Sequence, residues 1–274
     1  MRRIATGMLT TALSAAVLAA GLGFTESVSA AGAEFSYNGD TGPAYWFELS
    51  PDWAACAGTA VDARQSPVNI HRTRFDPHLK SLALQTHPTS IDMFNNGHTI
   101  EQHYEGTGSR IVFEGTTYEL QQFHFHTLSE HVISGEHADM ELHAVFQDAA
   151  GVSNLVVGVL FEDGKKNNPF LQTLIDAGLP AKNGDTTVTS TQIDLADVLT
   201  STASYFTYPG SLTTPPCSET VTWVVLAKPA KMTHAQGQSF RRILGNDFRP
   251  LQDLNGRRVR STNVMPPHGF GQDN

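Results

Sequence analysis

The segment Gln122-Phe-His-Phe-His126, in which phenylalanine and histidine alternate, restricts the fold more than any other part of the sequence. Successive side chains of a β-strand point to opposite faces of its sheet. In a strand, Gln122, His124 and His126 therefore share one face, and the two phenylalanines share the other. We expect a strand here with one aromatic face and one polar face, and the polar face presents two histidines on the same side.

Short strand-like runs separated by turn signals make up most of the remaining sequence. The runs are rich in β-branched and aromatic residues, and residues such as Gly106-Thr-Gly108 and Asp163-Gly164 indicate turns between them. The strands that we predict are Ser109–Phe113, Thr117–His126, Met140–Gln147, Asn154–Phe161 and Thr220–Ala227. Helical patterns are few and short, at Asn168–Ala177 and Thr233–Leu244. The sequence thus predicts a single, mainly β domain with a large central sheet.

The two ends of the chain are predicted to lie outside this domain. Arg2 and Arg3, an apolar run at Thr10–Leu22 and the small residues Val28-Ser-Ala30 follow the order of a secretory signal peptide. A membrane anchor is the alternative, but the apolar run is shorter than the ~20 residues that a span needs. We therefore predict a signal peptide at 1–30, a catalytic domain at 31–262 and a loose tail at 263–274, in a protein exported to the periplasm or secreted.

Composition and charge limit the partners of the chain. Hydrophobic residues make up 40% of the sequence, which is enough to form a buried core. The formal net charge is −9, whereas binding to nucleic acid or to anionic membranes needs a basic surface. We expect a small-molecule substrate, no nucleic acid and no membrane span in the mature chain, and the sequence leaves a homodimer open.

Cys56 and Cys217 are the only cysteines, and both lie in the part of the chain that would be exported. Disulfides persist in secreted and periplasmic proteins, so we predict that these two residues are bonded to each other. Two buried free thiols are the alternative. A thiolate zinc site is disfavoured because the sequence has no C-x-x-C pair.

The histidines of the alternating segment have the spacing of metal ligands. His124 and His126 would lie about 6.6 Å apart along a strand, close enough for both imidazoles to form Zn–N bonds of about 2.0–2.1 Å. A turn at Ser134-Gly-Glu136 leads to a second predicted strand, which carries His143. If the two strands pair, they lie about 4.8 Å apart and His143 supplies a third nitrogen. Three neutral imidazoles with one position left for water describe a catalytic Zn²⁺ site.

Polar residues two positions before these histidines support the metal interpretation. Gln122 precedes His124 and Glu141 precedes His143 on the same strand face, where each can bind the second nitrogen of a ligand ring. Ordinary core or surface histidines are one alternative. A cupin-like iron oxygenase is another, because the strand histidines and Glu130 have the spacing of the first cupin motif, but no Gly-Pro-Gly-His-Asn pattern follows.

Several motifs in a fixed order resemble those of α-class carbonic anhydrases. They are Gly42-Pro43 with Trp46, Gln65-Ser-Pro-Val-Asn-Ile70, Asn95-Asn-Gly-His98, Gln122-Phe-His-Phe-His126, Ser129-Glu-His131, Glu141-Leu-His143 and Tyr208-Pro-Gly-Ser-Leu-Thr-Thr-Pro-Pro216. The resemblance covers the chain from about Tyr37 to Arg260. It implies a large, mostly antiparallel twisted sheet with short peripheral helices, and a disulfide between the two cysteines.

The resemblance also implies a reaction and the residues that perform it. Family members convert carbon dioxide reversibly to bicarbonate and a proton through a zinc-bound hydroxide. By position, Thr213 would bind this hydroxide and donate its own proton to Glu130, and Thr214 would contact the substrate. The apolar wall that receives carbon dioxide would consist of Val145, Val156, Leu212, Val221 and Trp223. The presence of all three histidines argues against a non-catalytic binding protein with the same fold.

A proton path is the last assignment that the resemblance supplies. His98 lies in a loop that we expect to be exposed and mobile, and it matches the family's proton shuttle. Histidine titrates in the range that this task requires. Tyr37 and Asn96 match residues that order a chain of water molecules. The sequence departs from the family at Thr127, where vertebrate members usually carry tryptophan.

Overall fold

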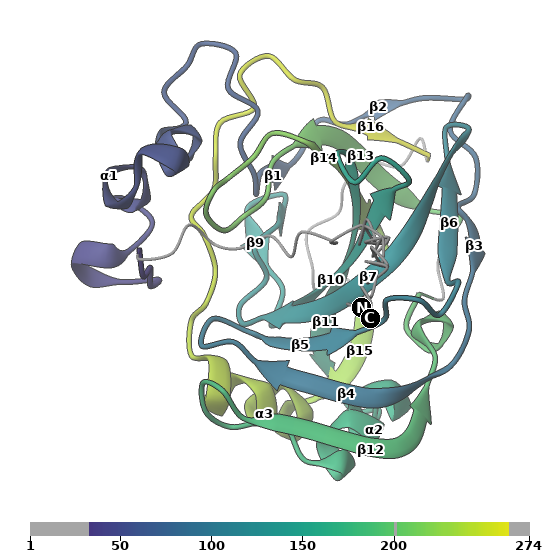
Figure 1. Cartoon of the computed structure of the whole chain (residues 1–274). Coiled ribbons are helices and arrows are strands. Elements are labelled where there is room, and N and C mark those ends of the chain that lie inside the picture. The colour runs from purple at the N-terminus through teal and green to yellow at the C-terminus, as the bar shows by residue number, and fades with distance from the viewer. Residues whose placement is uncertain (1–32, 200–201, 263–274) are drawn as a thin grey trace, which may run out of the picture. The chain divides into compact units, whose positions relative to one another are not determined.

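A large, twisted sheet lies at the centre of the protein, and short helices lie at its periphery (Figure 1). The structure is a computed structural model that describes residues 33–199 and 202–262. The predicted signal peptide at 1–30 and tail at 263–274 lie outside the described residues, so both remain predictions. The mainly β class and the large central sheet that the sequence indicates are confirmed.

Thirteen of the described strands form this sheet. Its main order is β12 (Thr186–Ile193), β4 (Thr89–Asn95), β5 (Ile100–His103), β7 (Thr116–His126), β10 (Met140–Asp148), β11 (Asn154–Gly164), β14 (Val221–Leu226), β13 (Tyr205–Gly210), β16 (Arg260–Ser261) and β2 (Arg74–Phe75). In addition, β15 (Ala230–Thr233) pairs with β11, and β6 (Arg110–Phe113) pairs with both β3 (Ala83–Gln85) and β7. Most pairs are antiparallel, but β11 runs parallel to β14 and β15, and β16 runs parallel to β2. The sheet is therefore mixed.

The smaller elements connect and cover the sheet. A second sheet contains β1 (Asn69–Ile70), β8 (Val132–Ile133) and β9 (Glu136–His137), and the predicted turn at Ser134-Gly-Glu136 joins β8 to β9. The helices are η1 (Gly39–Thr41), α1 (Trp46–Leu49), η2 (Pro51–Ala57), α2 (Pro169–Ala177), η3 (Leu195–Asp197) and α3 (His234–Leu244). Both predicted helices form, with Asn168 and Thr233 as their N-caps. None of the described helices is long and apolar enough to cross a membrane.

The aromatic face of β7 is buried under the two longer helices. Phe123 is 0% exposed and Phe125 is 1% exposed. Their rings contact Phe170 of α2, at a centroid distance of 5.5 Å, and Phe240 of α3, at 4.6 Å. Burial of such a side chain contributes about 1.5–3 kcal/mol. This packing fixes which face of β7 is turned to the core, and the histidines consequently lie on the opposite face.

The pairing of β7 with β10 brings the histidines of the two strands together. The two strands are antiparallel, and His143 lies directly opposite His124, while Glu141 lies opposite His126. The register shifts by a β-bulge immediately after Val145, which lies opposite Gln122. The pairing is regular from Glu141 to Val145. The polar faces that the sequence predicts for the two strands therefore lie on one side of the sheet, and the bulge lies outside this stretch.

Gly158 of β11 leaves room for a buried carboxylate beside these histidines. It lies opposite His143 in the register of β10 and β11. A Cβ atom built at Gly158 would lie 2.7 Å from Oε1 of Glu141, which is closer than van der Waals contact permits. The backbone angles do not demand glycine at this position, so the requirement comes from the close approach of Glu141.

We predict that Gly158→Ala destabilises the protein by roughly 1–3 kcal/mol, because the added methyl group displaces Glu141 from a packed interior. Gly164→Ala is the matched control on the same strand, since its Cβ would meet no atom closer than 3.5 Å. Urea denaturation of both variants measures the difference. Equal stability of the two variants would contradict the proposed close approach.

Candidate metal centre

Three histidine rings converge on one point at the polar side of β7 and β10. The ring centroids are 5.1 Å apart for His124 and His126, 5.2 Å for His124 and His143, and 4.7 Å for His126 and His143. One nitrogen of each ring lies within 4.8 Å of the others. His126 and His143 are each 1% exposed, and His124 is half-buried. The structure therefore brings together the three residues that the sequence singles out as ligands.

Each ring has one nitrogen turned to an oxygen acceptor. Nδ1 of His124 lies 2.8 Å from Oε1 of Gln122, and Nδ1 of His126 lies 2.7 Å from the main-chain oxygen of Asp247. Nε2 of His143 lies 3.1 Å from Oε1 of Glu141, although this contact is not aligned as a hydrogen bond. A carbonyl oxygen only accepts, so the facing nitrogen carries the proton. The lone pairs of the other three nitrogens remain available to a metal.

Two buried polar atoms without hydrogen-bond partners lie at the three-histidine site. Nε2 of His126 and Oε2 of Glu130 have no hydrogen-bond partner within residues 33–199 and 202–262, and the two atoms lie 3.7 Å apart. A buried polar atom without a partner costs about 1–3 kcal/mol. A divalent cation bound by the rings would use the lone pair of His126 and would offset the negative charge of Glu130. The residues present thus fit a Zn²⁺ ion.

The charge states of the rings also suit a metal ligand. Burial lowers the pKa of His124 well below its ordinary value, and His126 and His143 lower it further. Burial also lowers the pKa of His143. For His126, burial is outweighed by Glu130 and Asp247, which raise its pKa. At least two of the rings are neutral near pH 7, which is the form that binds a metal.

A second cluster close by is saturated with hydrogen bonds. His131, Glu141 and His143 also present ligand atoms within 4.8 Å of one another. However, Oε1 of Glu141 accepts a bond of 2.7 Å from His131, and Oε2 accepts the N–H groups of Glu130 and His131 at 2.8 Å each. The other ring nitrogen of His131 bonds to the hydroxyl of Tyr208 at 2.6 Å. This cluster is therefore a support for the three-histidine site and a poor metal site itself.

Glu141 stays ionised within this network. Its burial alone would raise its pKa, but His131 and His143 outweigh that effect and hold the pKa of Glu141 well below its usual range. A buried carboxylate that accepts from two main-chain N–H groups is strongly favoured in its charged form. The carboxylate next to His143 is therefore negative at all pH values near neutrality.

The predicted bond between Thr213 and Glu130 is not formed in this structure. Thr213 is 5% exposed, in the loop that follows β13. Oε1 of Glu130 accepts the N–H group of Arg249 at 2.8 Å, and Oε2 has no described donor. Thr214, the next residue, is half-buried. The structure thus leaves an acceptor on Glu130 vacant, and the roles of both threonines remain predictions.

The predicted apolar wall lies beside the histidines. Trp223 is 1% exposed, and its ring centroid is 4.7 Å from that of His143. Val156, Val221 and Trp223 belong to one cluster of buried hydrophobic residues, and the partly buried Val145 and Leu212 pack against it. Val156 lies directly opposite both Val145 and Trp223 in the strand register.

His98 is less exposed than the sequence suggests. It lies between β4 and β5, and its ring is stacked on Phe35 at a centroid distance of 3.8 Å. Burial lowers the pKa of His98. The side chain of Asn96 accepts the N–H groups of His98 and Thr99 at 3.0 and 2.9 Å, so it shapes the loop itself. The expectation of an exposed loop is therefore wrong for this side chain, because Phe35 covers one face of the ring.

Tyr37, the other residue predicted to order water, lies near the buried carboxylates. Its hydroxyl is buried and has no hydrogen-bond partner in the described part of the chain. Burial raises the pKa of Tyr37, and the charges of Glu130 and Asp247 raise it further. The hydroxyl is therefore neutral and able to donate a hydrogen bond.

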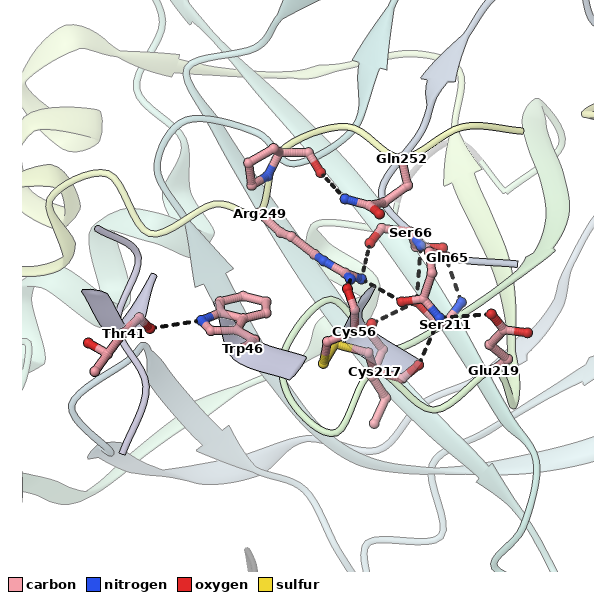
Figure 2. The surroundings of a disulfide bond; sticks show 12 residues. Thr41, Trp46, Cys56, Gln65, Ser66, Ser211, Cys217, Glu219, Arg249 and Gln252 are labelled. Carbon is pink, nitrogen blue, oxygen red and sulfur yellow. Dashed lines mark hydrogen bonds between the residues drawn. A yellow bond between two sulfur atoms is a disulfide. The ribbon is translucent and has the colours of Figure 1, made fainter. Parts of the chain in front are cut away.

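Cys56 and Cys217 form the predicted disulfide, with an S–S distance of 2.02 Å. Figure 2 shows that the guanidinium of Arg249 lies next to this bond and stacks near Trp46. It donates to the main-chain oxygens of Cys56 and Ser66 at 3.0 and 2.8 Å. The same residue binds Glu130 through its main-chain N–H, so it connects the disulfide region to the site.

Sequence reasoning missed Arg249 and Asp247. Both are almost completely buried, at 1% and 2% exposure. Burial raises the pKa of Asp247 to about 7, although the neighbouring His126 and a main-chain bond from Thr127 oppose this effect. Charged residues are seldom buried, and no spacing rule links a segment near the C-terminus to a strand more than a hundred residues earlier.

Comparison with known proteins places the chain among relatives of the same size and architecture. A sequence model of the family described as eukaryotic-type carbonic anhydrase matches residues 41–263. A carbonic anhydrase of Nostoc sp. is 38% identical over 229 residues, which is 82% of this chain and 84% of that protein. A carbonic anhydrase of Klebsiella pneumoniae is 39% identical over 227 residues, which is 82% of this chain and 89% of that protein.

Solved structures agree with the sequence matches. The α-carbonic anhydrase of Thermovibrio ammonificans, determined in complex with the inhibitor sulfanilamide, has a TM-score of 0.78 and 36% identity, and the match covers 84% of this chain and 99% of that chain. Because the family's sequence pattern and its fold both extend over nearly all of the described residues, the chain belongs to the eukaryotic-type, or α-class, carbonic anhydrase family.

Proposed function

We propose that this chain hydrates carbon dioxide reversibly, with a Zn²⁺ ion held by His124, His126 and His143. Membership of the family supports carbon dioxide hydration in general. The observation that carries the metal assignment is the convergence of three rings, each of which has its other nitrogen turned to an oxygen. A Zn²⁺ ion in such a site supplies a water molecule with a pKa near 7, a value established for carbonic anhydrases themselves.

Glu130 and Thr213 orient the reacting oxygen in this proposal. Oε2 of Glu130 is a buried acceptor without a described donor, and the hydroxyl of Thr213 can donate to it. A threonine whose hydrogen is used in this way has only its oxygen lone pairs left for the reacting group. The threonine oxygen can then only accept a hydrogen bond, so it fixes the orientation of the reacting group before the reaction, which is a preorganisation effect.

The apolar wall binds the substrate. Carbon dioxide is small and has no net dipole, so a pocket of Val145, Val156, Leu212, Val221 and Trp223 would hold it without a specific hydrogen bond. Thr214, which is half-buried in the loop between β13 and β14, would contact the bicarbonate product. The wall stands beside His143 and therefore beside the metal.

His98 transfers the proton to solvent in this proposal. A group with a pKa near 7 releases its proton to water at no more than about 10³–10⁴ per second, if the reverse reaction is near the diffusion limit. A histidine at the edge of the site can exceed this rate by exchanging protons with buffer. Asn96 holds the loop of His98, and Tyr37 offers a hydroxyl for the intervening water.

We also propose that the protein acts outside the cytoplasm. The Cys56–Cys217 disulfide favours an oxidising compartment, and the signal-peptide pattern at 1–30 predicts export. Sulfanilamide, the inhibitor in the complex of the Thermovibrio relative, is the probe that we expect to bind at the metal.

Zinc analysis and stopped-flow carbon dioxide hydration of the purified mature protein test the proposal together. We predict one Zn²⁺ per chain and measurable hydration, and the loss of both in His143→Ala, because two rings alone do not complete the site. His234→Ala is the control, since that side chain is 75% exposed and pairs with Asp163, outside the group of three ligand histidines. Full zinc occupancy without hydration would refute the proposed reaction.

For the proton path, we predict that His98→Ala lowers kcat by roughly tenfold or more while kcat/KM is unchanged, because only the proton transfer is slowed. Added imidazole buffer should restore part of kcat. His87→Ala, which alters an exposed histidine, should leave both constants as they are. If imidazole has no effect on His98→Ala, another group carries the proton.

A further inference from the structure

Residues 245–249 are attached by hydrogen bonds to Thr127, the residue that follows the end of β7. The hydroxyl of Thr127 donates to the main-chain oxygen of Gly245 at 2.5 Å. The N–H of Asp247 donates to the main-chain oxygen of Thr127 at 3.2 Å, and Oδ1 of Asp247 accepts the N–H of Thr127 at 2.7 Å. Asp247 thus binds both main-chain groups of the residue that follows His126.

The same residue contacts His126 twice. Its main-chain oxygen accepts the proton of Nδ1 at 2.7 Å, and Oδ2 of its carboxylate lies 3.7 Å from the same nitrogen. Oδ2 is buried and has no hydrogen-bond partner among the described residues. The only ion-pair partner that the described structure gives Asp247 is His126. The carboxylate, in its ionised form, is therefore directed at one ring of the metal site, and no lysine or arginine of the described residues pairs with it.

We propose that the Asp247 carboxylate is a positioning group for the metal: it stabilises the proton on Nδ1 of His126 and thereby strengthens Nε2 as a zinc ligand. This inference rests on the proposed zinc site. Acceptors at the second nitrogen of a ligand histidine raise its basicity and fix its orientation. Glu141 has the corresponding place beside His143, whereas His124 has only the neutral amide of Gln122.

The arrangement places two carboxyl groups, those of Asp247 and Glu141, behind the three ligands. A carboxylate on each of two rings increases the electron density of both donor nitrogens, and it partly balances the charge of a bound divalent ion. The main-chain groups of Thr127 hold the Asp247 carboxylate in register with His126. The hydroxyl of Thr127 adds a bond to the main-chain oxygen of Gly245.

Asp247→Asn removes the carboxylate charge and keeps the hydrogen bonds that join residue 247 to Thr127, so it tests the charge separately from these bonds. The asparagine has the same shape, its side-chain oxygen can still accept the N–H of Thr127, and the main-chain bond to His126 is unchanged. Its amide group, however, turns a donor toward the Nδ1–H donor of His126. We predict that zinc affinity, measured by competition with a chelator, falls by about 10–100-fold, while the urea midpoint of the zinc-free protein changes little.

Thr127→Val is the matched control. It removes the hydroxyl's bond to Gly245 and its long bond of 3.4 Å to Oδ1 of Asp247. It leaves in place the main-chain bonds between the two residues and the contact between Asp247 and His126. We predict a lower urea midpoint with zinc affinity close to that of the wild type. Asp247→Ser, with a smaller side chain that lacks charge, should lose zinc affinity as Asp247→Asn does, so the result does not depend on one variant.

The outcomes separate this inference from the proposed function. If the wild type binds no zinc, the proposed function is wrong. If the wild type binds zinc and Asp247→Asn binds it equally well, only the role of Asp247 is refuted. An equal loss of affinity in Asp247→Asn and Thr127→Val would also refute it, because the effect would then be one of general structure. A loss confined to the Asp247 variants supports the inference.

Discussion

The antiparallel register of β7 and β10 is the constraint on which the site depends. It places His143 opposite His124, and a shift of one residue would turn every side chain of one strand to the other face. The phenylalanines of β7 prevent such a shift, because they are buried between the sheet and helices α2 and α3. The hydrophobic core thus determines the geometry of a polar centre on the opposite face of the same strand.

Around this centre, buried polar groups are arranged so that the imidazoles retain their lone pairs. Gln122, Glu141 and the main chain of Asp247 each face one ring nitrogen. Glu141 is in turn held by two main-chain N–H groups and by His131. Burial of so much charge without a counter-ion is costly, and a divalent cation at the three rings would offset part of that cost. A bound ion would therefore stabilise the folded protein as well as serve the proposed reaction.

Much of the fold and of the site could be predicted from sequence, because local rules apply to them. The alternation in β7 predicts its two faces, and the N-caps Asn168 and Thr233 correctly mark the starts of α2 and α3. The edge strands were harder to recognise. β12 has the sequence Thr-Thr-Val-Thr-Ser-Thr-Gln-Ile, which is mostly polar because its residues are largely exposed. Such a strand lacks the hydrophobic alternation that reveals a buried one.

Long-range contacts account for the remaining differences. Asp247 and Arg249 are brought to the site by the path of the chain after α3, which no local pattern encodes. The ring of Phe35, near the start of the described chain, covers His98 and reduces its exposure. The resemblance to a family correctly predicts the disulfide, and the three histidines that it names converge in the structure. It transfers roles only to residues within the matched motifs, so it does not anticipate the contacts of Asp247 and Arg249.

In the proposed site, Nε2 of His124, Nε2 of His126 and Nδ1 of His143 bind one Zn²⁺ ion. A crystal structure of the zinc-loaded protein, with the metal located by anomalous diffraction, tests this assignment. We predict a tetrahedral ion with these three nitrogens at about 2.0–2.1 Å and a fourth, non-protein ligand. An ion bound instead among His131, Glu141 and Nε2 of His143, or bound through other nitrogens of the three rings, would contradict it.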